Sequence, residues 1–471
     1  MKKNKLTHNP EKMDHEEITR INNKSIAENS DKFTKDGRII AAIDIGTTKI
    51  VAIIGAVSEE GKVKVLGMGK SNSQGVSRGV VLNIEKASAS IQEAVRMAEN
   101  ESGIQFDNVY VGIAGQHIKS MKNRHSKYIQ SKDNEIKQSD VDDLLEDMHN
   151  IALDAGEEII HVIPQNYTVD NESGVKQPIG MFGKCLEANF HIVVGEIGSA
   201  KHIYKSVERA DLKVDKMILE PLASSSAVLS NDEKEIGVVM VDIGGGTTDL
   251  AIYYDGILRH TAVIPFGGNV ITMDIKDACG ILHRQAELLK VQFGTALGEA
   301  SPEDIVSIKG ISGREPKKIS IKFLSKVIQA RMEEIIDHVV FEIENSGFVD
   351  KIGAGITITG GGALLKHLRQ LMSYKTSLDV NVGYPSRALS AENQEVNLPI
   401  YSTSIGLLLS GYQLEKENEF KEVKNETEEV DDKLIDSEEE MEMEDEYGEN
   451  NFFNQLKEKV GNFFEDKSSK M

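Results

Sequence analysis

A pattern of three short strands joined by glycine turns and followed by a helix occurs twice in the sequence, and this duplication restricts the possible folds most. The first copy opens near Arg38 and the second at Ile236, so Asp44 corresponds to Asp242, 198 positions later. The predicted strands are Ile39–Asp44, Lys49–Val57 and Lys62–Gly67 in the first copy and Ile236–Asp242, Asp249–Tyr254 and Leu258–Ile264 in the second. A repeated unit of this kind predicts two similar α/β domains that face one another.

Two further segments interrupt the repeated units and are predicted as inserts. The first contains a strand at Asn108–Ile113, a helix that opens at Ser139-Asp140, and a strand pair between Glu158 and Val194. The second is mostly helical, with a loop around Gly310–Pro316. The predicted division is a disordered leader at 1–37, a first domain at 38–106 plus 195–235 and 395–413, an insert at 107–194, a second domain at 236–272 plus 346–394, a second insert at 273–345, an acidic disordered linker at 414–449 and an amphipathic helix at 450–466.

The negative charge of the chain is concentrated in one segment. The formal net charge is −22, and residues 415–450 carry 18 acidic and 4 basic side chains. Such a segment repels itself and cannot bury a core, which predicts a linker. The overall charge argues against nucleic-acid binding. No apolar run approaches the roughly 18 residues of a membrane-spanning helix, and the two cysteines, Cys185 and Cys279, lack the spacing of metal ligands.

Each copy of the repeat contains a loop suited to binding phosphate. In Ile43-Asp44-Ile45-Gly46-Thr47-Thr48-Lys49 and in Val241-Asp242-Ile243-Gly244-Gly245-Gly246-Thr247-Thr248-Asp249, an acid ends an apolar strand and small residues form the turn. Such a turn directs backbone N–H groups toward one point, and glycine lets a phosphate approach the backbone. The acids suit Mg²⁺, which prefers carboxylates together with phosphate oxygens. One such loop is equally consistent with a plain hairpin turn, but two at matching places favour a phosphate site.

Further candidates for contacts with a nucleotide lie in the second half. The strand Ile356–Thr359 runs into Gly360-Gly361-Gly362, where a helix is predicted to begin; the alternative is an ordinary strand-to-helix turn. Glu287 and Lys290 lie one helical turn apart and could hold the ribose and the base, or could form a solvent-exposed ion pair. The segment Gly69-Lys70-Ser71 imitates a nucleotide P-loop, but a lysine stands at position 64 where that motif requires glycine.

Two paired loops, a third glycine turn and a duplicated unit resemble the ATPase superfamily of actin, sugar kinases and heat-shock chaperones. Glu220-Pro221-Leu222-Ala223-Ser224-Ser225 and Ser402-Thr403-Ser404-Ile405-Gly406-Leu407 resemble its two connecting helices, which form the hinge between the domains. A closer resemblance is carried by His161-Val162-Ile163-Pro164-Gln165 with Tyr167, by Glu208-Arg209-Ala210 and by Ala296-Leu297-Gly298. On these segments the chain is identified as a member of the FtsA family of bacterial actin-like cell-division proteins, and the insert at 107–194 stands where FtsA has its distinctive subdomain.

The resemblance implies an actin-like ATPase fold with an FtsA-type insert, ATP and Mg²⁺ as cofactors, and at most slow ATP hydrolysis. Glu220 stands where chaperone-like members keep a carboxylate near the attacking water. Asp44 and Asp242 would hold the metal ion. The residues that would contact ATP are Gly46, Thr47, Thr48, Lys49, Gly244, Gly245, Gly246, Thr247, Glu287, Lys290, Gly361 and Gly362.

The segment 450–466 forms one apolar stripe if it is helical. On a helical wheel its six apolar residues lie within one arc of about 120°: Phe452, Phe453, Leu456, Val460, Phe463 and Phe464. Lysines at the edges of the stripe, with acids opposite, are typical of a helix that lies on a membrane surface. The alternatives are docking on the protein's own core or in the groove of a protein partner.

The resemblance therefore implies an adaptor that tethers the FtsZ ring to the inner membrane. Its expected partners are the C-terminal tail of FtsZ, further copies of itself in an actin-like protofilament, the lipid surface and later division proteins. It would lie as a peripheral protein on the cytoplasmic face of the membrane, at the septum. The alternatives are a rod-shape or pilus-assembly actin-like ATPase, a sugar kinase and a chaperone-type ATPase. The turnover rate, the filament geometry, the FtsZ contact residues and the role of the leader do not follow from the sequence.

Overall fold

The computed structural model describes residues 37–419 except 132, 311–314 and 392. Of these residues, 37–413 belong to one compact unit and 414–419 to another. Nearly all of the predicted leader, nearly all of the linker and the whole predicted amphipathic helix lie outside the described residues. Among the described residues no helix is long and apolar enough to cross a membrane.

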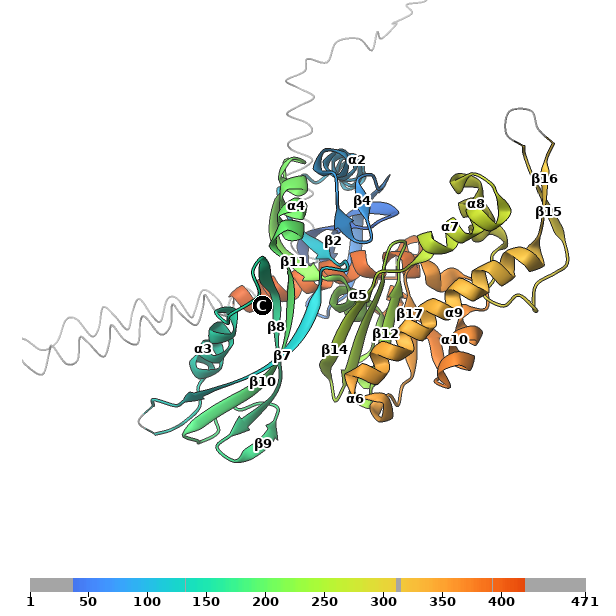
Figure 1. The fold of residues 1–471 in the computed structure, drawn as a ribbon. Coiled ribbons are helices and arrows are strands. Elements are labelled where there is room, and N and C mark those ends of the chain that lie inside the picture. Colours follow the sequence, from blue (N-terminus) through green and yellow to red (C-terminus); the bar gives the residue numbers. More distant parts are fainter. Residues whose placement is uncertain (1–36, 132, 311–314, 392, 420–471) are drawn as a thin grey trace, which may run out of the picture. The chain divides into compact units, whose positions relative to one another are not determined.

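The first half is built on a five-stranded sheet in the order β11-β6-β1-β2-β3 (Figure 1). Its strands are β1 (Arg38–Ile45), β2 (Lys49–Val57), β3 (Val63–Asn72), β6 (Asn108–Ile113) and β11 (Lys213–Leu219). The first three strands pair antiparallel, whereas β6 and β11 add in parallel to β1. The strands β1 and β2 are apolar and buried along nearly their whole length, which is typical of a sheet covered on both faces.

The second half repeats this sheet, in the order β18-β17-β12-β13-β14. Its strands are β12 (Val238–Ile243), β13 (Thr248–Tyr254), β14 (Ile257–Ile264), β17 (Ile356–Thr359) and β18 (Val380–Val382). Again the first three strands are antiparallel and the last two are parallel to the central strand. The duplication predicted from the sequence is therefore present in strand order and in strand direction.

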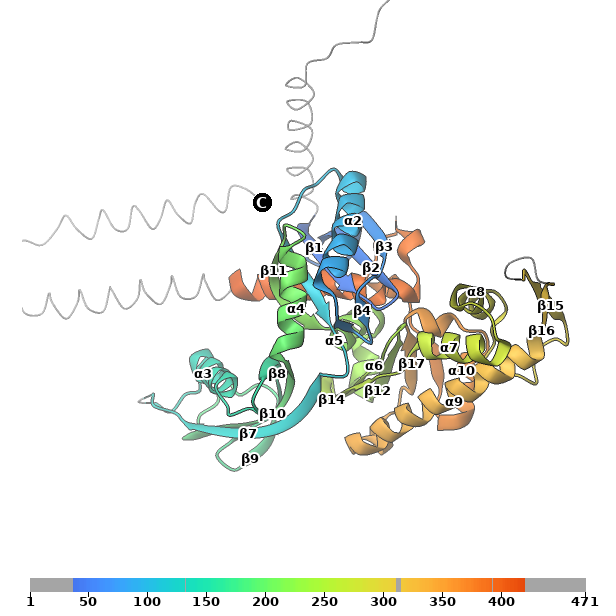
Figure 2. The same cartoon turned by 45° about the horizontal axis from the view of Figure 1, so that its top comes forward.

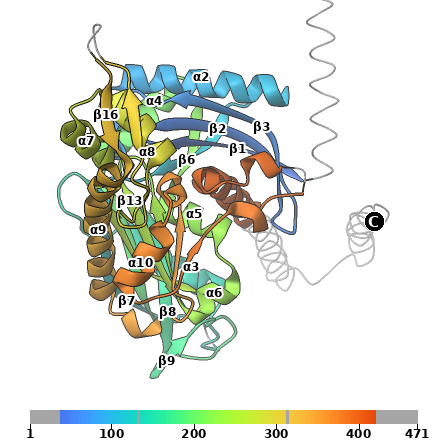
Figure 3. The same ribbon diagram turned by 90° about the vertical axis from the view of Figure 1, so that its right-hand side faces the viewer.

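Helices cover the sheets. In the first half, α2 (Ile84–Ser102) packs on β2 and β3, and α4 (Ile197–Glu208) packs beside α2 (Figure 2). Gly69 of β3 has no room for a side chain, because a Cβ there would overlap the Ala94 carbonyl of α2. The glycine of the P-loop imitation thus serves close packing of a helix on a strand. In the second half, Figure 3 shows α9 (Ile321–Ser346) and α10 (Leu368–Thr376) along the sheet, and α7 (Gly268–Cys279) and α8 (His283–Phe293) complete that layer.

Two helices connect the halves. One is α5 (Glu220–Val228), which follows β11 and is itself followed by the short α6 (Asn231–Ile236); the other begins at Ser402. They cross where Gly406 lies against the backbone of Ala223, and a Cβ at Gly406 would overlap the Ala223 carbonyl. Ser226 of α5 also donates a hydrogen bond to the Gly406 carbonyl, at 3.3 Å.

The insert has a sheet of its own, in the order β7-β10-β8-β9, with every pair antiparallel. Its strands are β7 (Lys119–Tyr128), β8 (Glu157–Val169), β9 (Glu172–Val175) and β10 (Cys185–Glu196), and α3 (Gln138–His149) packs on β7 and β8. A separate apolar core, with Leu144, Leu186 and Phe190 fully buried, holds the insert together.

Several local expectations differ from the structure. The second insert is mostly helical, as predicted, but it also contains a strand pair that was not predicted, β15 (Ile305–Ile308) and β16 (Lys317–Ser320). A small hairpin, β4 (Val76–Ser77) and β5 (Val80–Val81), was also not predicted, and β3 extends to Asn72 because its second part pairs with β2. After β17 the chain forms a 3-10 turn at Gly361–Leu364 rather than the start of an α-helix. The unpredicted strands are only two to four residues long, which is too short for a periodic signal.

Candidate functional site

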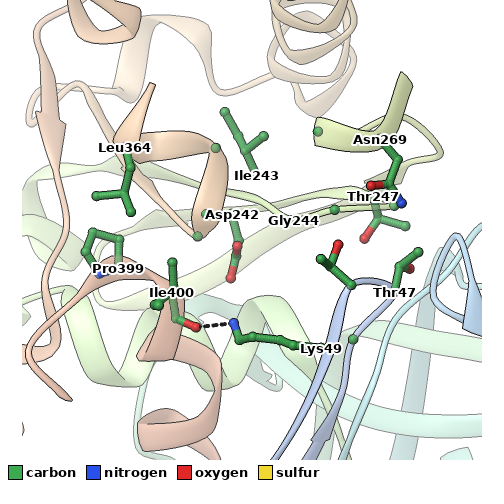
Figure 4. Close-up of a pocket in the computed structure, with 18 of the residues that line it drawn as sticks. Thr47, Lys49, Asp242, Ile243, Gly244, Thr247, Asn269, Leu364, Pro399 and Ile400 are labelled. Carbon is green, nitrogen blue, oxygen red and sulfur yellow. Dashed lines mark hydrogen bonds between the residues drawn. The ribbon is translucent and has the colours of Figure 1, made fainter. Parts of the chain in front are cut away.

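A cavity of about 490 Å³ lies between the two halves and is lined by both (Figure 4). All fifteen residues of the first unit that the sequence marks as metal, nucleotide or catalytic candidates line it. They come from the loop after β1, the loop after β12, the start of α5, the helix α8 and the turn after β17. Segments separated by more than 300 residues in the sequence therefore meet in one cavity, whose size is typical of small-ligand sites.

The two glycine loops face one another across this cavity. A Cβ on Gly245 would overlap the hydroxyl of Thr48, and a Cβ on Gly246 would overlap the hydroxyl of Thr47. Gly244 and Gly245 also accept hydrogen bonds at the start of α7, from the N–H groups of Gly268 (2.9 Å) and Asn269 (2.8 Å). The glycines are therefore required for close contact between the loops, and α7 begins beside them with the positive end of its helix dipole.

Besides Glu287, four carboxyl groups line the cavity: Asp44, Asp242, Asp249 and Glu220. Burial raises the pKa of Asp44, although the nearby Lys49 charge and a 3.1 Å hydrogen bond from Ser404 oppose this rise. Burial likewise raises the pKa of Asp242, whose Oδ2 accepts hydrogen bonds from two hydroxyl groups. The pKa of Glu220 lies well above its ordinary value because of burial and of the neighbouring aspartates. So many buried carboxyls in one place favour a cation among them.

Asp249 gives the clearest sign that such a cation fits. Its Oδ2 accepts a hydrogen bond from the Thr247 hydroxyl at 2.8 Å, but its Oδ1 is buried and has no partner among the described residues. Burial and the Asp242 charge raise the pKa of Asp249 to about 8. The described residues contain no ready-made cluster of three metal ligands. A Mg²⁺ ion held by one or two carboxylates, with waters and phosphate oxygens, needs no such cluster.

Lys49 connects the first loop to the residues that lead into the second connecting helix. Its Nζ donates a hydrogen bond to the Ile400 carbonyl at 2.6 Å, which Figure 4 shows as a dashed line, and it lies 5.5 Å from the centre of the Tyr401 ring. The ammonium group thus lies in the cavity with Asp44 and Asp242, where it offsets part of their negative charge.

Glu287 and Lys290 form a partly buried network rather than a solvent-exposed ion pair. Lys290 Nζ lies 2.8 Å from Glu287 Oε2, and the Lys290 side chain is 14% exposed. The same Nζ donates to the Gly268 carbonyl (2.9 Å) and to Thr272 (2.8 Å). Apolar side chains also line the cavity: Ile243, Ile271, Val291, Met332, Leu364 and Pro399. The cavity therefore combines buried carboxyl groups and directed polar groups with an apolar lining.

Several residues that line the cavity were not predicted from the sequence. Asp249 ends the second loop motif, and its place directly opposite Asp242 in the β12–β13 register could have identified it. Lys70, within the rejected P-loop imitation, lines the cavity from β3. Gly79, at the tip of the unpredicted β4–β5 hairpin, lines it too and donates its N–H to Thr47 at 3.1 Å. No sequence signal placed Lys70 or Gly79 there. The six apolar residues of the predicted membrane helix lie outside the described residues.

Comparisons with known proteins agree on one family. Residues 239–406 match the family model described as "Cell division protein FtsA", and residues 115–194 match "SHS2 domain inserted in FTSA". The cell division protein FtsA of Pseudomonas aeruginosa is 38% identical over 380 residues, 80% of this chain and 90% of that protein. The FtsA protein of Escherichia coli (strain K12) is 35% identical over 384 residues, 80% of this chain and 91% of that protein.

Solved structures share the fold at much lower identity. A structure of a "PilM-PilN type IV pilus biogenesis complex" has a TM-score of 0.59 at 13% identity, covering 79% of this chain and 98% of that one. MreB5 of Spiroplasma citri bound to ADP has a TM-score of 0.51 at 16% identity, covering 82% and 99%. The predicted actin-like architecture with its insert is thereby confirmed.

Proposed function

Because the chain belongs to the FtsA family of cell division proteins, we propose that it binds Mg-ATP between its two halves and anchors a division filament to the membrane. The observation that carries the nucleotide part is the convergence of both glycine loops, the carboxylates and the Glu287–Lys290 network on one cavity. MreB5, which shares the fold, was solved bound to ADP, and this supports a nucleotide as the ligand of the cavity.

The residues around the cavity suit the two ends of a nucleotide. The loops at Gly46–Thr48 and Gly244–Thr247 would hold the phosphates through backbone N–H groups and hydroxyls. Glu287, Lys290, Gly361 and Gly362 would contact the nucleoside. A Mg²⁺ ion held by Asp44 and Asp242, with Asp249 Oδ1 as a further acceptor, would neutralise phosphate charge.

Hydrolysis would be slow. Glu220 lines the cavity at the start of α5, and its raised pKa suits a group that orients water rather than a fully ionised base. An adaptor needs its nucleotide state to last long enough for assembly, so a slow rate of ATP hydrolysis fits the proposed role. The domain boundaries predicted from the sequence also belong to this proposal, except that Asn108–Ile113 (β6), predicted in the insert, pairs with β1 in the sheet of the first half.

The adaptor role joins three contacts. Self-assembly into an actin-like protofilament would place many copies side by side, the second insert would bind the C-terminal tail of FtsZ, and the segment 450–466 would bind the inner membrane on its cytoplasmic face at the septum. Its six apolar residues, each partly buried, would contribute roughly 4–6 kcal/mol after the cost of ordering the helix. That corresponds to affinities of roughly millimolar to tens of micromolar, so one copy would detach readily. A filament with many such segments would stay attached through avidity and recruit later division proteins.

A rod-shape or pilus-assembly actin-like ATPase is the alternative. The structural likeness to the PilM and MreB5 structures is a likeness of fold alone at 13% and 16% identity. The match of residues 115–194 to the FtsA insert, together with the identity to FtsA proteins over 80% of the chain, favours the division role.

The test is sedimentation of the full chain with vesicles of anionic phospholipid, followed by electron microscopy of the vesicle surface. With Mg-ATP we expect binding and filaments on the vesicles. Phe463→Asp places a charge in the apolar stripe and should release the protein while nucleotide binding is unchanged, and Phe463→Leu is the matched control that should bind. Equal binding of Phe463→Asp and the wild type would refute the membrane role of this segment.

A further inference from the structure

The insert of the first half contacts the edge of the second sheet. The strand β14 is an edge strand, and Figure 1 shows β7 and β8 of the insert next to it. Ser120 of β7 donates its hydroxyl to the Thr261 carbonyl at 3.0 Å, and Gln165 of β8 donates Nε2 to the Leu258 carbonyl at 2.6 Å. Side chains of the insert thus satisfy backbone carbonyls on a sheet edge, where a neighbouring strand would otherwise do so.

The centre of this contact is buried. Thr261 is 4% exposed, and its hydroxyl lies 2.7 Å from Ser120 Oγ and 3.0 Å from His191 Nε2. His191 is 1% exposed, and burial lowers its pKa to about 4. The imidazole is therefore neutral near pH 7, and the centre of the contact is a network of neutral polar groups. The ion pair of Lys176 with Asp255 lies at the rim, where both side chains are exposed to solvent.

Gln165 reaches β14 because of a bulge in β8. Asn189 of β10 pairs with Asn166, whereas the next residue, Phe190, pairs with Pro164, so Gln165 is the extra residue. A bulge turns the extra side chain out of the regular alternation, and proline there gives up no ladder donor. The backbone of Gln165 also accepts a hydrogen bond from Arg259 of the second half, at 3.3 Å.

The strand β8 is also hydrogen-bonded to the first half. His161 Nε2 accepts a hydrogen bond from the Leu219 N–H at 3.0 Å, directly before α5. Burial lowers the pKa of His161 to about 4, which keeps the ring neutral and able to accept. Gln165, four residues after His161 on β8, is hydrogen-bonded to Leu258 of the second half. One short segment therefore bridges both halves at a place separate from the two connecting helices.

We propose that this contact between the insert and β14 is a second, breakable connection between the halves, which holds the cleft closed and slows nucleotide release. The inference rests on the proposed binding of nucleotide in the cleft. Rotation about the two connecting helices separates the halves, and such opening is the usual route by which ligand leaves a cleft between domains. Because β8 moves with the first half and β14 with the second, opening must break the hydrogen bonds of Gln165 and Ser120.

A reversible crosslink tests this directly. The hydroxyls of Ser120 and Thr261 are 2.7 Å apart, so cysteines at both positions can form a disulfide with little movement. The pair would be made in a full-length chain in which the native thiols are removed by Cys185→Ser and Cys279→Ala. Release of a fluorescent ATP analogue is followed by stopped flow in the oxidised and reduced forms of the same molecule. We expect release at least about 10-fold slower when oxidised, and restored by reduction; Ser120→Cys alone should show no redox effect.

A second variant weakens the contact instead of locking it. Gln165→Met keeps the length of the side chain but cannot donate to Leu258, and loss of one such hydrogen bond should speed release about 2- to 10-fold. Lys176→Gln, at the exposed rim, is its matched control and should change little. Equal release in both redox states, or failure of the disulfide to form, would overturn the inference. If neither form bound the nucleotide, the proposed function would fall with it.

Discussion

Replacing Gly406 by alanine should destabilise this protein, although helix propensity alone predicts the opposite. In an exposed helix interior, alanine is more favourable than glycine by about 1 kcal/mol. Gly406, however, is buried where the helix that begins at Ser402 crosses α5. A methyl carbon at this position would lie 1.8 Å from the Ala223 carbonyl oxygen and 3.0 Å from the Ala223 Cα.

The magnitude follows from the backbone overlap. Both helices are backbone at the point of contact, so no side chain can rotate away, and the helices must separate by roughly 1.5 Å to restore ordinary contact. Overpacking of this kind costs about 3 kcal/mol, which leaves a net loss of about 2 kcal/mol after the gain in propensity. The separation also disturbs Ser224 and Thr403, which lie one on each helix and both donate to Asp242 Oδ2, at 2.7 and 3.1 Å. The substitution should therefore weaken binding of Mg-ATP as well as stability.

Urea unfolding followed by circular dichroism, together with calorimetric titration of Mg-ATP, measures both effects. Gly198→Ala is the matched control, because Gly198 lies in α4, is exposed and has open space around its Cα. That variant should unfold at an equal or higher urea concentration than the wild type. If Gly406→Ala were as stable as Gly198→Ala, or bound nucleotide normally, the argument that close helix crossing supports the carboxylate site would be refuted.

Three further predictions concern single side chains. Asp242→Ala should remove an anchor of the metal and cost several kcal/mol of Mg-ATP affinity; unchanged calorimetric binding would contradict the site. Glu220→Gln should leave binding intact and slow single-turnover hydrolysis by roughly 10²-fold, whereas equal rates would leave Glu220 with a structural role only. Because the pKa of His161 falls from 6.5 to about 4 on folding, the wild type should lose up to about 3 kcal/mol of stability from this group as the pH falls from 6.5 to 4. His161→Gln keeps an acceptor for Leu219 and cannot titrate, so its urea midpoint should fall less over that range, and parallel pH profiles would refute this.

The local sequence pattern was sufficient to predict the two halves and their glycine loops. Apolar runs that end in an acid and a glycine turn predict strand, turn and strand through interactions between near neighbours, and the second copy shows that the pattern is not accidental. For this reason Asp44, Asp242 and the glycines of their two loops could be assigned to one site before the distance between the loops was known. All of them line one cavity.

The resemblance to FtsA supplied more than periodicity could. Through the wider superfamily it pointed to Glu220, and it favoured a nucleoside contact over an exposed ion pair for Glu287 and Lys290, which their spacing had already made candidates. It also singled out His161–Gln165, but only the structure connects that segment to Leu219 on one side and to Leu258 on the other.

Only the tertiary structure decided the contacts between residues that are far apart in the chain. Ser120 and Thr261 are 141 positions apart, and neither lies in a pattern that predicts a partner. The buried, unpartnered Oδ1 of Asp249 and the overlap that restricts Gly406 depend on how whole sheets and helices pack. Near neighbours in the chain determine strands, turns and helices. The burial of a carboxylate, the lack of space at a glycine and the bridge between two halves depend on long-range packing, which no single stretch of sequence contains.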